Sequence, residues 1–169
     1  MTTRTSPAGR ILVGVDGSPG SAAAVRWAAR EAQLRGMRVH VLYVRDRRVP
    51  APAHYAPRPR AGDAEAGWPA GESTITAVLN EALGPEPWAG VQAELADGLP
   101  ARELLERAAG AEMLVLGSTQ PGGEAASPGP QPRTPLGPVA RDCLRAAPCP
   151  VVVVRSRGVR SAAQPVSVP

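Results

Sequence analysis

The chain has 169 residues and a formal net charge of +4, and all 19 of its basic residues are arginines. Apolar residues make up 43% of the chain, which is enough for one buried core and excludes wholesale disorder. The positive excess lies in residues 45–60, where four prolines interrupt it and no ordered basic face with interleaved aromatics is indicated. The composition therefore argues against a nucleic-acid-binding protein.

The first half of the chain predicts two strands, a capped helix and a second helix. Apolar runs at Ile11–Val15 and Val39–Val44 have the length and residue types of buried strands. Between them, Ser18 followed by a proline predicts the start of a helix over Ser21–Arg35, which Gly36 ends. A second helix is predicted from one apolar stripe that ends before Gly84, formed by Ile75, Val78, Leu79 and Ala82.

The second half continues the alternation of strands and helices. Strands are predicted at Val91–Leu95, Met113–Leu116 and Val151–Val154. A third helix starts at Pro100, and a fourth follows Gly137, with Val139, Cys143 and Leu144 expected to face the core. This order predicts an α/β fold, a parallel sheet with helices on both faces. We expect one domain over residues 9–155, flexible tails at 1–8 and 156–169, and long loops at 45–72 and 117–137.

Several functional classes are not predicted. The first ten residues are polar, and no apolar run approaches the roughly 20 residues that span a bilayer, so we expect a cytoplasmic protein with no membrane partner. Cys143 and Cys149 have the spacing of neither a redox nor a zinc motif, and we predict no metal site. We also predict no enzyme, because no nucleophile and base can be paired.

Two strand ends are candidates for ligand binding, since ligands of such sheets bind beyond the carboxyl ends of the strands. Asp16 either accepts a hydrogen bond from a ligand hydroxyl or amine, or accepts backbone N–H groups in its own turn. Gly117 opens a glycine-containing loop that could approach an anion, and the next helix would add its positive end. The loop is not a Walker motif, because the chain has no lysine.

These residues resemble the universal stress protein (UspA) family over residues 10–155. The resemblance rests on four segments: residues 10–18, which read RILVGVDGS; residues 39–46; residues 114–123; and residues 139–155, which end in APCPVVVVR. It implies a Rossmann-like, five-stranded parallel sheet in the order 3-2-1-4-5. It also implies a homodimer that pairs the last strands, here Val151–Val154.

The ATP-binding branch of this family implies a set of nucleotide contacts in this chain. The adenosine end would meet Gly14, Val15, Asp16 and Val44. The phosphate end would meet the loop from Leu116 and Gly117 through Thr119 and Gln120 to Gly137, Pro138 and Val139.

The phosphate loop departs from the family pattern of Gly-x-x-Gly, nine residues and a closing Gly-Ser or Gly-Thr. Gln120 replaces the second glycine, Pro138 replaces the closing hydroxyl residue, and seven residues are inserted before Gly137. We therefore expect a stress-response regulatory domain with an unidentified protein partner, in which ATP binding is weakened or lost and Mg²⁺ is present only with nucleotide. The alternative is a functional ATP-binding switch, in which arginines compensate at the phosphates: Arg45, Arg47 and Arg48 after the second strand, and Arg133 in the inserted loop.

Overall fold

The computed structural model describes residues 9–46, 70–85, 87–118 and 136–155. The elements follow the predicted alternation: β1 (Arg10–Val15), α1 (Pro19–Arg35), β2 (Arg38–Arg45), α2 (Ala70–Leu83), β3 (Val91–Asp97), α3 (Pro100–Ala108), β4 (Met113–Ser118), α4 (Pro138–Ala146) and β5 (Val151–Arg155). The predicted tails and most of the two predicted long loops fall outside the described residues.

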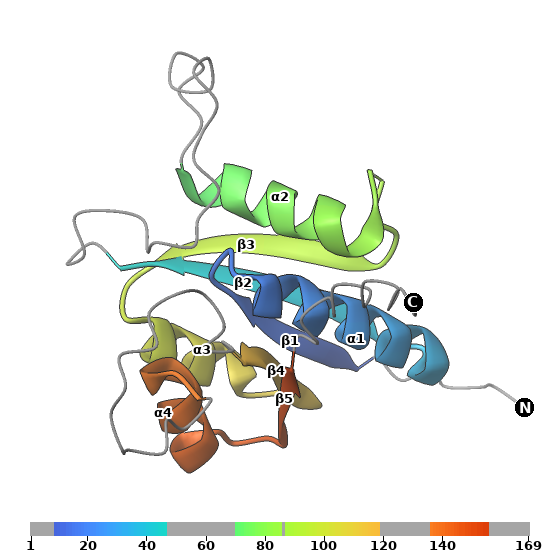
Figure 1. Cartoon of the computed structure of the whole chain (residues 1–169). Helices are drawn as coiled ribbons and strands as arrows, with labels where there is room; N and C mark the ends of the chain where they lie inside the picture. The colour runs from blue at the N-terminus through green and yellow to red at the C-terminus, as the bar shows by residue number, and fades with distance from the viewer. Residues whose placement is uncertain (1–8, 47–69, 86, 119–135, 156–169) are drawn as a thin grey trace, which may run out of the picture.

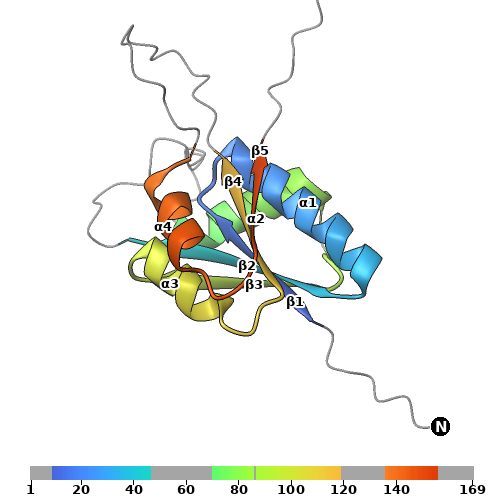
Figure 2. The same ribbon diagram turned by 90° about the horizontal axis from the view of Figure 1, so that it is seen from below.

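The five strands form one parallel sheet in the order β3-β2-β1-β4-β5. The predicted fold class and strand order are thus confirmed. The helices cover both faces of the sheet, with α1 and α2 on one side and α3 and α4 on the other (Figures 1 and 2). Because both faces are covered, the central strands are apolar throughout rather than alternating with polar residues.

Two cores result, one on each face of the sheet. Under α1 and α2, Val13, Val41 and Val115 pack with the alanine-rich face of α1 and with the predicted apolar stripe of α2. Under α3 and α4, Leu12 and Leu114 pack with Leu104, Ala108 and Cys143. The two cores take alternate residues of the same strands, since successive side chains of a strand point to opposite faces of the sheet.

The ends of α1 match the sequence signals for them. The Ser18 hydroxyl accepts a hydrogen bond from the backbone N–H of Ser21 at 3.3 Å. At the other end, Gly36 has φ 66°, and its N–H donates to the carbonyl of Ala32. One helix prediction is wrong: Leu144 of α4 is 45% exposed instead of facing the core. It lies about 100° around the helix from the buried Cys143, away from the stripe that contacts the sheet.

Candidate functional site

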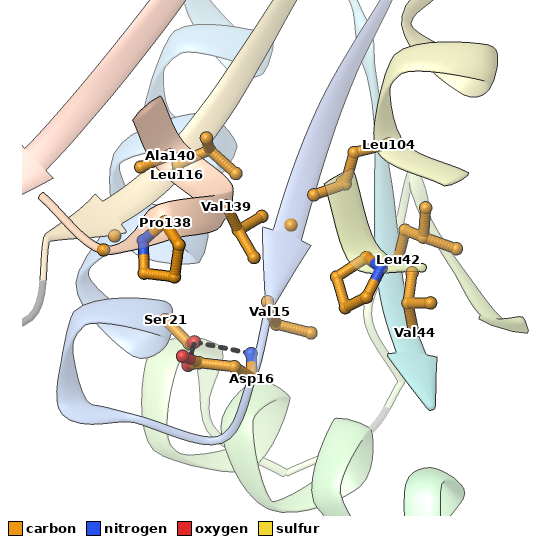
Figure 3. Close-up of a pocket in the computed structure, with 14 residues that line it drawn as sticks. Val15, Asp16, Ser21, Leu42, Val44, Leu104, Leu116, Pro138, Val139 and Ala140 are labelled. Carbon is orange, nitrogen blue, oxygen red and sulfur yellow. Dashed lines mark hydrogen bonds between the residues drawn. The ribbon is translucent and has the colours of Figure 1, made fainter. Parts of the chain in front are cut away.

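A pocket lies at the carboxyl ends of β1, β2 and β4, where the strand order reverses about β1 (Figure 3). Its volume is about 350 Å³. Its walls are mainly aliphatic side chains, a proline ring from each of α3 and α4, and glycine backbone. The lining residues are Gly14, Val15, Asp16, Ser21, Leu42, Val44, Pro100, Leu104, Leu116, Gly117, Gly137, Pro138, Val139 and Ala140.

The structure brings together nine of the eleven residues predicted to bind nucleotide. From the adenosine set these are Gly14, Val15, Asp16 and Val44, and from the phosphate set Leu116, Gly117, Gly137, Pro138 and Val139. Thr119 and Gln120 lie outside the described residues. Segments far apart in the sequence therefore converge on one cavity, whose volume is near the lower end of the roughly 300–1,000 Å³ usual for small-molecule sites.

Sequence reasoning missed five of the lining residues: Ser21, Leu42, Pro100, Leu104 and Ala140. Leu42 could have been found, because it lies two positions before Val44 and so points to the same face of β2. Pro100 and Leu104 belong to α3, and whether they line the pocket depends on how that helix packs across the sheet, which local sequence patterns do not determine.

Gly14 has a packing role in this pocket. A Cβ at this position would lie 2.7 Å from Leu116 Cδ2 and 2.9 Å from Leu104 Cδ2. Both leucines line the pocket, so the missing side chain lets them close over β1. The glycine thus shapes the apolar floor of the pocket.

The Asp16 carboxylate is held in place by the first turn of α1. Its Oδ1 accepts from the backbone N–H of Ser18 at 3.0 Å and from the Ser21 hydroxyl at 2.7 Å. The Ser21 hydroxyl in turn accepts from the backbone N–H of Asp16 at 2.9 Å (Figure 3). Oδ1 of Asp16 therefore accepts a backbone N–H within its own turn, which is the second of the two roles that the sequence suggests for this residue. Among the described residues Oδ2 has no partner, and the side chain is exposed, so Oδ2 can accept from a ligand.

Gly117 also has a packing role that the sequence did not indicate. A Cβ here would lie 2.9 Å from Gly20 Cα and closer still to the Gly20 carbonyl carbon and oxygen. The reciprocal Cβ on Gly20 would lie 2.8 Å from the carbonyl oxygen of Ser118. The end of β4 and the start of α1 therefore meet backbone to backbone, which requires glycine on both sides.

Among the described residues, one carboxylate contributes the charge of the pocket lining. Asp16 is the sole formally charged residue in the lining described above. Burial and, second, the charge of Asp16 raise the pKa of Tyr43 on the neighbouring strand. Arg45, which only the alternative ATP-binding hypothesis brings to the phosphates, is not in the lining, and its Nε and Nη2 donate to the two carboxylate oxygens of Asp97 at 2.5 and 2.9 Å.

The amino end of α4 forms part of the pocket wall. Gly137 is its N-cap residue and Pro138 its first residue, so the first backbone position of the helix has no N–H to offer a ligand. Val139 follows, with its side chain directed into the pocket, and Ala140 is buried behind it (Figure 3). This arrangement can bind a largely apolar ligand and accept hydrogen bonds from it at Asp16.

A family model described as the universal stress protein family matches residues 7–155. The chain belongs to this family. A universal stress protein of Mycobacterium tuberculosis is 32% identical to it over 151 residues, which cover 86% of this chain and 48% of that protein. Another from Mycolicibacterium smegmatis is 32% identical over 161 residues, or 85% of this chain and 47% of that one. This universal stress protein chain thus spans about half the length of the curated relatives it matches.

Solved structures of universal stress proteins share the fold. One in complex with cAMP has a TM-score of 0.57 and 20% identity, and covers 90% of this chain and 100% of that one. Another, from Archaeoglobus fulgidus in complex with dAMP, has a TM-score of 0.54 and 21% identity, and covers 88% and 99%. The family prediction made from residues 10–155 is confirmed.

Two further features are absent from the described residues. None of the helices that the structure describes is long and apolar enough to cross a membrane. Within the same residues, histidine, cysteine and acidic side chains form no group that could hold a metal ion.

Proposed function

We propose that this universal stress protein is a regulatory domain that binds an adenine nucleotide by its adenosine end in the pocket between β1, β2 and β4. The observation that supports this most is the convergence of the adenosine set, Gly14, Val15, Asp16 and Val44, on one cavity with mainly apolar walls. Structural neighbours in complex with cAMP and dAMP are consistent with an adenine ligand.

In this proposal the phosphate end of the site is weakened. Pro138 supplies neither the backbone N–H nor the hydroxyl of the family motif, and hydrogen bonds to a charged group contribute about 1.5–3 kcal/mol each. Losing two of them lowers affinity by roughly a hundredfold or more. Gln120, the second departure, lies outside the described residues. ATP is then a weak ligand, and Mg²⁺ accompanies it only as its counterion.

The alternative is a functional ATP-dependent switch in which arginines compensate at the phosphates. Arg45 lies outside the pocket lining and is paired with Asp97 through Nε and Nη2, so to reach the phosphates it would have to move toward the pocket. The other candidates, Arg47, Arg48 and Arg133, lie outside the described residues. The two proposals differ in one measurable quantity, the affinity for ATP relative to AMP.

Regulation in this proposal depends on assembly rather than catalysis. β5 is the last strand of the sheet, and its four valines are half-buried, with one backbone edge facing away from β4. An apolar edge strand of this kind pairs readily with a second copy. We propose a homodimer through Val151–Val154, and a further protein partner whose binding depends on whether the pocket holds a ligand.

Titration calorimetry with AMP and with ATP plus Mg²⁺ tests the proposal. We expect measurable AMP binding and weaker ATP binding. A Val139→Trp variant would fill the pocket and abolish AMP binding, whereas Leu144→Trp, on the exposed side of the same helix, would leave it unchanged. The proposal is wrong if neither AMP nor adenosine binds, or if both variants bind AMP as the parent does. ATP binding tighter than AMP binding would support the alternative switch.

A further inference from the structure

We infer that the pocket selects an uncharged adenine nucleoside over its phosphorylated forms. This inference rests on the proposed adenine site and specifies the class of ligand that the site takes. Three features of the described residues carry it: the charge of the lining, the first residue of α4, and the free oxygen of Asp16.

The charge of the lining disfavours a phosphate. Among the described residues the one formally charged lining residue is Asp16, an anion, and the arginine on the neighbouring strand, Arg45, lies outside the lining and is paired with Asp97. A phosphate in this cavity would meet a like charge at its rim, and no cation among the described lining residues offsets that repulsion. A neutral ligand has no such cost.

The helix end that would otherwise attract an anion begins with proline. Helix amino ends bind phosphate through N–H groups that point at the ligand. At α4 the first of these positions is Pro138, which has no N–H and places its ring in the pocket lining, so only later positions of the helix can donate (Figure 3). An aliphatic ring at this position contacts an uncharged part of a ligand more favourably than a charged one.

The free oxygen of Asp16 suits a hydroxyl-bearing ligand. Oδ1 is held by Ser18 and Ser21, so the carboxylate is fixed in orientation before any ligand arrives. Oδ2 can then accept from ribose hydroxyls, which are donors in a nucleoside. An ionised phosphate has no proton to donate. AMP and ATP also carry ribose hydroxyls, so this carboxylate distinguishes them from adenosine through its repulsion of the added phosphate.

Calorimetry on the whole chain with adenosine, AMP and ATP plus Mg²⁺ tests the inference without any variant. We expect adenosine to bind at least tenfold more tightly than AMP, and AMP more tightly than ATP. Equal affinities, or tighter binding of AMP or ATP, would overturn the inference and leave the proposed adenine site standing. Failure of all three to bind would overturn both.

Two variants identify the residues responsible. Asp16→Asn keeps an oxygen that accepts from Ser18 but removes the charge, so adenosine binding should weaken roughly tenfold and the preference over AMP should shrink. Pro138→Ser should tighten AMP binding and leave adenosine binding nearly unchanged. Pro148→Ser, the same exchange at an exposed position outside the lining, is the matched control and should change neither. If Asp16→Asn and Pro138→Ser both keep the parent's adenosine-to-AMP ratio, the assignment is wrong.

Discussion

Replacing Gly117 with alanine tests the contact between β4 and α1 directly. The new Cβ would overlap three backbone atoms of Gly20, one of them 2.9 Å away and two closer. Backbone atoms cannot rotate out of the way as a side chain end can. Helix α1 would therefore have to move off the sheet, although Ala22, Ala24, Val25 and the rest of its inner face are buried there.

We expect Gly117→Ala to lower the free energy of unfolding by about 2–3 kcal/mol, the upper part of the range for overpacked sites. For a domain of this size that corresponds to a fall in Tm of roughly 5–10 °C. Urea unfolding followed by circular dichroism measures it. Gly137→Ala is the matched control, because a Cβ there meets nothing within 4 Å and φ is −65°.

The two glycine variants separate packing from ligand binding. Both residues line the pocket, but on this reasoning only Gly117 carries a tight backbone contact. Gly137→Ala should be neutral or slightly stabilising, because alanine restricts the unfolded chain. A Gly117→Ala protein within about 0.5 kcal/mol of the parent would refute the proposed close contact.

Three further predictions follow from single side chains. Ser21→Ala removes the hydroxyl that holds Asp16 and should cost about 1–2 kcal/mol in urea unfolding; an unchanged midpoint would contradict this role. Burial and, second, the nearby carboxylate of Asp142 raise the pKa of Cys143 to about 11. Burial also raises the pKa of Cys149. Of the two thiols, Cys143 is buried and Cys149 is partly accessible. A thiol reagent at pH 8 should therefore label Cys149 and spare Cys143 until the protein unfolds, and equal labelling rates would refute this. Val152→Arg should convert the proposed dimer to a monomer by light scattering, and an unchanged mass would exclude β5 as the interface.

Much of the site could be predicted from the sequence because its members stand at ends of recognisable elements. Gly14, Val15 and Asp16 end a strand, and Gly137 and Pro138 begin a helix, so local patterns mark them. In a parallel sheet such ends meet at one edge, which is why these residues line one pocket. The resemblance to universal stress proteins then supplied the strand order that hydrophobic periodicity alone leaves open.

Features that depend on contacts between distant segments could not be predicted in this way. The sequence offers no reason to pair Gly117 with Gly20, or Arg45 with Asp97, because each pair becomes close only after the strands and helices have packed. The exposure of Leu144 is similar, since the pattern of a short helix does not say which part of its apolar stripe meets the sheet.

The sequence by itself thus determined the α/β alternation, the family and the strand ends that form the pocket, because these depend on local composition and spacing. Only the tertiary structure decided what those residues do there. It assigned Gly117 to a backbone contact, fixed one oxygen of Asp16 on Ser21, and placed the ring of Pro138 in the lining. The physical reason is that close approach, hydrogen-bond partners and local charge are properties of neighbours in space, and these neighbours come from different elements of the fold.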